Sequence, residues 1–231
     1  MKKYALLFSI SLVFFLIGNL PASLFASSIQ SPYLLEGSVW QGHTNNPKFG
    51  KIDWSFSPLA LFQAKLGWYI HIEQETHALV FDLSIDTSKQ LQFSDITGTL
   101  SSATLKKFKL LPDNISNIAS FEVKIDEFDI DWNANNLDAR PDSLQGLVQV
   151  KKLNVLGELL GDYQLRIDSE NEQLNGVVTD KDAQIKANLN ITLSPDNKLN
   201  IQGDIKANNQ KMQTLLNGAG INNKVKFNYQ L

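Results

Sequence analysis

Residues 185–205 read IKANLNITLSPDNKLNIQGDI, and this stretch decides the fold class. Apolar residues stand at every second position from Ile185 to Leu193, and again from Leu199 to Ile205. The intervening residues are almost all polar, which is the pattern of strands that are buried on one face only. Ser194-Pro195-Asp196-Asn197, between the two runs, is typical of a tight turn. The stretch therefore predicts an antiparallel hairpin with one apolar face and one polar, solvent-exposed face.

The same alternation predicts further strands along most of the chain. They lie at 34–40, 50–56, 66–74, 79–86, 91–101, 120–132, 144–153, 163–168 and 225–231. Strands that follow one another about every ten residues indicate a meander. The alternation changes parity between Asp126 and Glu127, which predicts a β-bulge. Residues 41–48 are expected to form a loop, and 180–182 a short link.

Helical signals are few and short. Ser57-Pro58 opens a helix at about 58–63, with serine at the N-cap and proline at the first helical position. A second helix is predicted at 208–217, stopped by Gly218, and a weaker third at 105–111. The predicted fold class is mainly β: a long, curved antiparallel sheet with a few short helices and an N-terminal transmembrane helix. Such short helices cannot cover the apolar face, so the sheet either closes into a sandwich or barrel, or forms a half-open groove that suits lipid or an apolar peptide.

The composition excludes several classes of function. The chain has 231 residues, 43% of them apolar and 19% charged, and a net charge of −3. This size fits one domain plus an anchor, and the charge balance argues against nucleic-acid binding. The absence of Cys excludes disulfides, thiolate metal sites and cysteine nucleophiles, and only three His are present. We expect no cofactor.

The N-terminus predicts export from the cytoplasm. Lys2 and Lys3 precede a run without charge, from Tyr4 to Gln30, that is apolar enough for a membrane anchor over residues 4–25. A cleaved signal peptide is the alternative, although Leu24 at position −3 makes the cleavage site after Ala26 a poor match. We expect residues 1–30 to be the cytoplasmic start and anchor (or signal peptide), and 31–231 to be a β-rich domain outside the cytoplasm.

Two clusters of polar residues could form a catalytic or metal-binding site, and we expect both to be ordinary solvent-exposed strand faces. Asp126, Glu127, Asp129 and Asp131 could bind a cation or act as paired carboxylates. His71 and His77, with Glu73 and Glu75 between them, lack the spacing of a zinc site. No catalytic, cofactor-binding or metal-binding residue is predicted. The tryptophans at 40, 54, 68 and 132 are expected in the core, and Gly157 and Gly161 in turns.

A series of weak motifs resembles one family when taken in order. They are Leu20-Pro21-Ala22, Leu35-x-Gly37-x-x-Trp40-x-Gly42, Trp54-x-x-Ser57-Pro58-x-x-Leu61, Gly67, the run from Phe93 to Leu100, and Leu160-Gly161-Asp162-Tyr163. Together they resemble protein N of the bacterial type II secretion system, the GspN family, over nearly the whole chain.

The resemblance implies an inner-membrane protein with a periplasmic β-rich body. It further implies a non-catalytic accessory role in moving folded periplasmic proteins across the outer membrane, with other inner-membrane secretion subunits as partners. Gly37 and Gly42 are expected where the backbone turns, and Trp40 and Trp54 as packing anchors. The strand pattern is also similar to that of β-groove proteins that handle lipid between bacterial membranes, so a lipid- or apolar-ligand-binding module is the alternative function. An enzyme that uses the acidic cluster is a third and weaker hypothesis.

Overall fold

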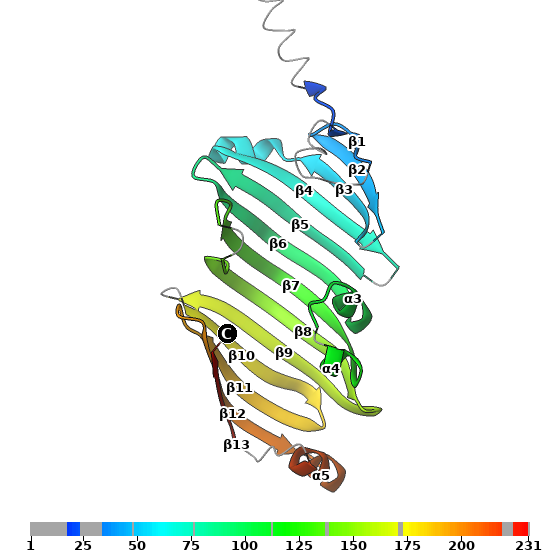
Figure 1. Cartoon of the computed structure of the whole chain (residues 1–231), viewed down its shortest axis with the longest axis vertical. Helices are drawn as coiled ribbons and strands as arrows, with labels where there is room; N and C mark the ends of the chain where they lie inside the picture. Colours follow the sequence, from blue (N-terminus) through cyan, green and yellow to red (C-terminus); the bar gives the residue numbers. More distant parts are fainter. Residues whose placement is uncertain are drawn as a thin grey trace, which may run out of the picture.

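The structure, a computed structural model, describes residues 18–23, 34–47, 49–75, 77–111, 113–136, 139–170, 173–218 and 224–230. They form one 13-stranded sheet in which each strand pairs with the next along the chain, in antiparallel orientation (Figure 1). The strands are β1 (Glu36–Gly37), β2 (Gln41–Asn46), β3 (Gly50–Phe56), β4 (Lys65–Gln74), β5 (His77–Asp86), β6 (Gln90–Ser101), β7 (Ala119–Asn133), β8 (Ser143–Val155), β9 (Glu158–Glu170), β10 (Gln173–Ala183), β11 (Ile185–Leu193), β12 (Lys198–Ala207) and β13 (Lys224–Gln230). The predicted mainly β fold and the meander are confirmed.

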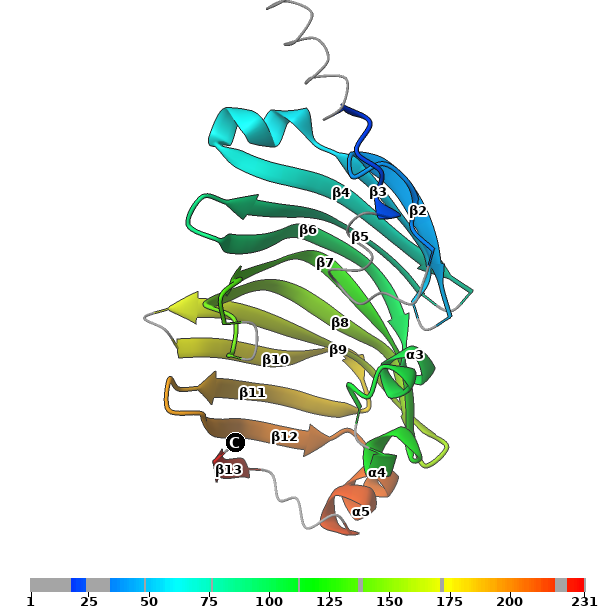
Figure 2. The same cartoon turned by 45° about the horizontal axis from the view of Figure 1, so that its top comes forward.

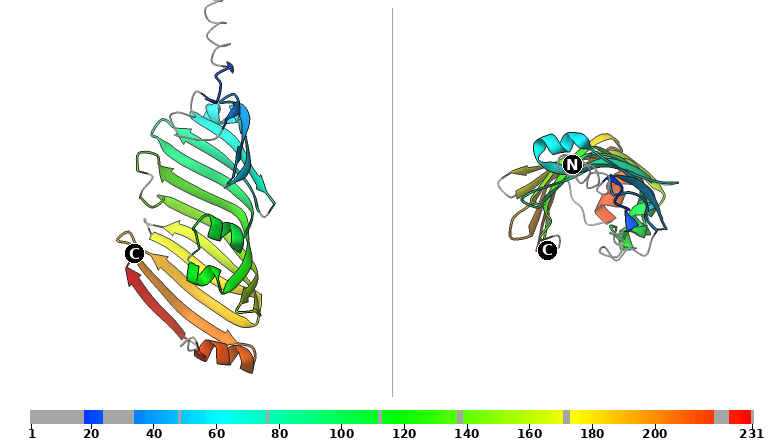
Figure 3. Two further views of the ribbon diagram at one scale, coloured as in Figure 1. Left: turned by 45° about the vertical axis from the view of Figure 1, so that its right-hand side comes forward. Right: turned by 90° about the horizontal axis from the view of Figure 1, so that it is seen from above.

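The sheet is open rather than closed. Strands β1 and β13 are its two edges and do not pair with each other. Seen along its long axis, the sheet curls into an arc that is open on one side (Figure 3). Of the two architectures left open by the sequence, the half-open groove is therefore right and the sandwich or barrel is wrong.

Bulges in the long central strands supply part of the curvature. The pairing of β7 with β8 shifts between Asp126 and Asp129, and Glu127 has a φ of 48°. The pairing of β6 with β7 shifts between Phe93 and Ile96, and Asp95 between them has a φ of 54°. Bulges bend a strand and increase its twist. The bulge predicted from the parity change at Asp126 and Glu127 is confirmed.

In the described part of the chain, four short helices accompany the sheet: the 3₁₀-helix η1 (Pro58–Gln63), α3 (Ser102–Lys107), α4 (Asp113–Ser116) and α5 (Gln210–Gly218). The helix predicted at 58–63 is confirmed, although the Ser57 side chain makes no capping hydrogen bond. The helix predicted at 105–111 begins earlier, because Ser101 Oγ accepts a hydrogen bond from Thr104 N at 3.1 Å and so caps α3. Helix α4 was not predicted.

Three strand predictions need correction. Residues 41–46 form β2 rather than a loop, and β1 is much shorter than the predicted strand 34–40. Residues 180–182 are not a link but the bulged end of β10, where the register with β9 shifts between Asp180 and Asp182. Strand β10 was missed because Gly176 occupies an apolar-face position and so interrupts the visible alternation.

The predicted anchor lies mostly outside the described residues, because only 18–23 of residues 1–30 are described. Within the described ranges, no helix is both long enough and apolar enough to cross a membrane. Residues Leu20–Ala22 join the start of the sheet: Val39 N donates to Leu20 O at 2.9 Å, and Ala22 N to Gly37 O at 3.1 Å.

Candidate functional site

The strand register builds one continuous apolar face. Residues directly opposite each other on antiparallel strands lie on the same face of the sheet. Opposed pairs on this face are Trp54 and Ile70, Trp68 and Leu83, Leu83 and Phe93, Phe93 and Ile130, Ile125 and Val148, Val148 and Leu165, Leu165 and Val178, Val178 and Leu189, Ile191 and Ile201, and Ile201 and Phe227. The apolar face therefore runs without a break from β3 to β13.

This apolar face is the concave side of the arc. Helix α5 packs on it, with Met212 and Leu216 buried against Ile185. Figure 3 shows α3, α4 and α5 inside the arc and η1 on its outside. Helix η1 meets the other face, because a Cβ atom built on Gly67 would lie 2.7 Å from Ala60 Cβ, and Gly67 precedes the inward-facing Trp68.

The helices cover only part of the groove. The buried apolar residues of the described sheet are few and lie beneath helices or near strand ends: Leu100, Val123, Ile185 and Ala187. Between them, Leu83, Phe93, Leu165 and Ile201 are only half-buried. Figure 2 shows α3, α4 and α5 gathered at one set of strand ends, and the described residues form no second layer over the centre of the sheet. The centre of the concave face is therefore an open apolar groove.

Charge is confined mainly to the convex face. Lys51 Nζ lies 2.8 Å from Asp53 Oδ1, and these residues flank the inward-facing Ile52. Lys124 Nζ and Asp126 Oδ1 are likewise 2.8 Å apart. Partly exposed pairs of this kind contribute little stability, about 0–1 kcal/mol each. They show instead that the charged side chains lie on the convex face, which is exposed to water, and are kept apart from the apolar concave face.

Asp180 is a carboxylate on the apolar face, at the end that α5 covers. Its Oδ1 accepts a hydrogen bond from Ala187 N at 3.0 Å. Opposite it lies Tyr163, whose hydroxyl donates to Ile185 O at 2.9 Å. Burial, and then the negative charge of Asp180, raises the pKa of Tyr163 to about 12. These bonds tie β9, β10 and β11 together and do not reach the open centre of the groove.

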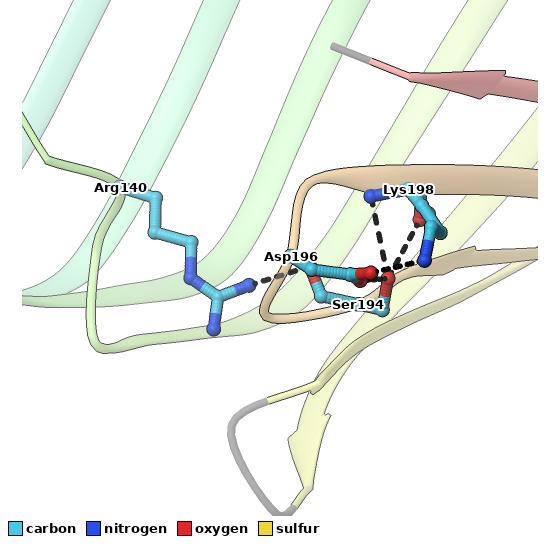
Figure 4. A network of polar contacts seen from close by, with 4 residues as sticks. All are labelled: Arg140, Ser194, Asp196 and Lys198. Carbon is cyan, nitrogen blue, oxygen red and sulfur yellow. Dashed lines mark hydrogen bonds and ion pairs between the residues drawn. The ribbon is translucent and has the colours of Figure 1, made fainter.

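A loop spans the opposite strand ends. The chain between β7 and β8 carries Arg140, whose Nη1 donates to Ser194 O at 3.1 Å in the turn between β11 and β12 (Figure 4). Because β9 and β10 lie between these elements in the sheet, the loop crosses their ends. Within the turn, Asp196 pairs with Lys198 and accepts from Ser194 Oγ at 2.5 Å. The hydrogen bonds from Lys198 and Ser194 lower the pKa of Asp196.

The acidic cluster lies around the β7 bulge on the convex side. Asp129 Oδ1 accepts a hydrogen bond from Asp95 N at 2.9 Å, and Gln149 Nε2 donates to Asp126 Oδ2 at 2.8 Å. The first contact joins the bulges of β6 and β7, and the second joins β7 to β8. Across the described ranges, no group of three His, Asp or Glu side chains is placed to hold a metal ion.

The histidines do not come together. His71 lies on the polar face of β4, opposite Asp53, as expected. His77, predicted to be exposed, is only 3% exposed: its ring stacks edge-on against Phe108, with centroids 5.5 Å apart, and its Nε2 lies 2.9 Å from Phe49 O. The prediction for His77 was wrong because the chain that continues from β6 through α3 covers the first residue of β5. His43 lies 3.2 Å from Glu36 on β1.

The tryptophans of the family-like motifs pack together at the N-terminal end of the groove. Trp54 Nε1 donates to Ser38 O at 3.0 Å, and Trp68 Nε1 to Val39 O at 2.9 Å. The rings of Trp40 and Phe56 meet edge to face at 4.7 Å. The predicted packing role of Trp40 and Trp54 is confirmed, and Trp132 is half-buried on the wall of the groove.

The motif glycines allow close contacts. Gly37 has a φ of 97°, and a Cβ on Gly42 would lie 2.4 Å from the Trp54 ring. Gly157 lies in the turn between β8 and β9 as predicted, whereas Gly161 lies within β9. A Cβ on Gly161 would lie 2.2 Å from Asp182 O, so this glycine serves a close strand contact rather than a turn.

These features define an open, single-layer β-groove protein. The sequence comparison adds the family: the model described as type II secretion system (T2SS), protein N, matches residues 34–227. The chain belongs to this family and is therefore a type II secretion component, as the order of its motifs predicted. No curated protein and no solved structure matches the chain.

Proposed function

We propose that the chain is a non-catalytic accessory component of the type II secretion system, anchored in the inner membrane. Residues 1–30 carry the anchor, and residues 31–231 stand in the periplasm. There the β-rich body assists the export of folded periplasmic proteins across the outer membrane, in contact with other inner-membrane subunits. The family match and the uncharged run that follows Lys2 and Lys3 support this proposal.

The observation that carries the proposal is the uncovered concave face in a secretion-system protein. A sheet with one apolar face normally needs a second layer against it. Among the residues that the structure describes, that layer is missing from the middle of the groove, where Leu83, Phe93 and Leu165 remain half-buried. A protein built in this way works by contact, through an occupant of its groove or a partner at its edges.

The test is recovery of partners from native membranes. The tagged full chain is extracted in mild detergent, and co-purifying proteins are quantified against an unrelated single-span protein with the same tag. We expect enrichment of inner-membrane secretion subunits. Equal recovery of those subunits with the control protein would contradict the proposed membership in the assembly.

Lipid binding is the second candidate function, and the charge-free centre of the groove favours it. Backbone groups within the sheet bond to neighbouring strands, so the concave face offers few hydrogen bonds to an occupant. A polypeptide in extended form would leave its own N–H and C=O groups unpaired there, at about 1–3 kcal/mol each. An acyl chain has no such groups, and each buried CH₂ gains about 0.8 kcal/mol.

A matched pair of variants tests the lipid candidate. Leu189 faces the groove and Asn190 faces outward on the same strand, since Leu189 lies opposite Val178 and Gly203. Native mass spectrometry of the purified full chain should detect bound phospholipid in the wild type and in Asn190→Lys, and at least tenfold less in Leu189→Lys. A wild-type chain without bound lipid after gentle extraction would count against this candidate and leave the secretion role untouched.

A further inference from the structure

The two edge strands of the sheet differ in length and in how far other residues cover them. Strand β1 has only two residues, and its outer side is met by Leu20–Ala22 through the hydrogen bonds Val39 N to Leu20 O and Ala22 N to Gly37 O. Strand β13 has seven residues and pairs with β12 along its inner side. Among the described residues, no strand lies on its outer side. The edge at β1 is therefore blunted, and the edge at β13 is open.

An open edge of this length needs an explanation. Unpaired strand edges present backbone donors and acceptors to any other chain, and proteins usually shorten or cover them. On β13, Phe227 and Tyr229 continue the apolar face and are 49% and 56% exposed, with their rings stacked at 6.2 Å. Among the described strands, these side chains have a neighbour only on the β12 side, which leaves the outer edge of β13 available for pairing.

The positive charge on the polar face of β13 indicates which charge a pairing segment should carry. Lys224 and Lys226 lie on the polar face, and the strand carries no carboxylate. Lys224 is opposite Asp204 on β12, whereas Lys226 is opposite the neutral Gln202. A carboxylate on the outer side of Lys226 would add an opposite-charge cross-strand pair, and a lysine there would repel it.

We propose that the outer edge of β13 is a strand-addition site for an extended segment of another secretion protein, in which apolar residues alternate with carboxylates. The segment's apolar residues would extend the row of Phe227 and Tyr229, and its carboxylates would meet Lys226. Its backbone would take the hydrogen bonds that the outer edge of β13 offers, the mode known as β-augmentation.

The position of β13 indicates where this partner is met. Twelve interstrand steps of about 4.8 Å put β13 about 58 Å from β1 along the curved sheet. Strand β1 adjoins Leu20–Ala22, near the C-terminal end of the anchor predicted over residues 4–25, and β13 lies at the opposite end of the sheet (Figure 1). The inference that the partner is met away from the inner membrane rests on the proposed function. The binding site at the edge of β13 does not depend on that function.

A charge-swap experiment tests the site on the purified full chain in detergent. The probes are two capped nine-residue peptides, one alternating valine with glutamate and the other valine with lysine, each at millimolar concentration. Hydrogen–deuterium exchange is read on residues 224–230, with 143–170 as the reference for an intact fold. We expect the glutamate peptide to slow exchange in β13 by about threefold or more, and the lysine peptide to have little effect.

Substitution of Lys226 should reverse the preference. Lys226→Glu should lose protection by the glutamate peptide and gain it from the lysine peptide, while Lys206→Glu, the same change on the interior strand β12, should behave as the wild type. The proposal is overturned if neither peptide protects β13, or if Lys226→Glu leaves the preference unchanged. Because the chain has no cysteine, Phe227→Cys adds a direct test for self-pairing: an oxidised dimer of this variant, with β13 already protected in the free chain, would show that a second copy occupies the edge and would also overturn the proposal. None of these results depends on secretion.

Discussion

Replacing Met212 with alanine should release α5 from the groove while leaving the sheet folded. The helix has nine residues and is too short to be stable alone in water. Its attachment depends on Met212, which is 1% exposed, and Leu216, which is 6% exposed. Asn209 caps it through a 2.9 Å bond from Met212 N, and the exposed pair of Lys211 and Glu158 adds little.

The magnitude follows from the buried volume that is lost. Truncating a fully buried methionine to alanine costs about 2–5 kcal/mol. Two buried side chains of this kind supply about 3–6 kcal/mol to the docking of a short helix, so even the lower figure removes a third or more of that stabilisation. Amide exchange over 210–218 should then accelerate at least about 30-fold, because about 1.4 kcal/mol corresponds to a factor of ten.

Hydrogen–deuterium exchange with mass spectrometry measures this directly, with β7–β9 as the internal reference. Thr214→Ala is the matched control, because Thr214 is exposed on the same helix and its hydroxyl bonds only to Gln210 O at 3.0 Å. If exchange in α5 is the same in Met212→Ala and in the wild type, the helix is not held by the contacts described above. If exchange rises equally throughout β7–β9, α5 is part of the global core rather than a separate cover.

Three further predictions test other parts of the structure. Gly42→Ala should lower the free energy of unfolding by about 1–3 kcal/mol, because the added Cβ would lie 2.2 Å from Glu36 O and 2.4 Å from the Trp54 ring. Gly218→Ala is the control, because the space around Gly218 is open. Equal urea midpoints for the two variants would contradict the packing described at β1 and β2. Hydrogen bonds from Lys152 N and Lys151 lower the pKa of Asp162 from 3.8, so its contribution to stability is present above the unfolded pKa and is lost as the pH falls through the folded one. The advantage of the wild type over Asp162→Asn should therefore be seen at pH 5–7 and shrink below about pH 4 in denaturant melts, and an advantage independent of pH would contradict this assignment. Ultraviolet titration of the tyrosines should show a late step near pH 12 that Tyr163→Phe removes, and its survival in that variant would show that Tyr163 is not the shifted group.

Period-two alternation was enough to predict the architecture, because each strand has one apolar and one wet face. Ile185–Leu193 and Lys198–Ala207 pair as the sequence indicates, and the parity change at Asp126 and Glu127 is a bulge. The alternation fails where glycine takes an apolar position. Gly176 concealed β10. In β2 the positions on the apolar face are Gly42, Thr44 and Asn46, none of them apolar, so no alternation was visible there.

The openness of the groove could not be decided from the sequence. The same apolar residues would suit a closed barrel or a half-open arc, and the difference lies in long-range pairing of the edges, which no local pattern records. The burial of His77 was missed for a related reason. It depends on Phe49 and Phe108, residues 28 positions before it and 31 after it, and neither interrupts the alternation around His77.

The most direct test of the account is a secretion assay in a strain that lacks this chain. Wild type, Leu189→Lys and Asn190→Lys are supplied at equal level, and the export of a folded type II substrate into the medium is measured. If the apolar concave face is the working surface, Asn190→Lys should restore export to the wild-type level and Leu189→Lys should not. Equal restoration by both variants would contradict the claim that this groove carries the function.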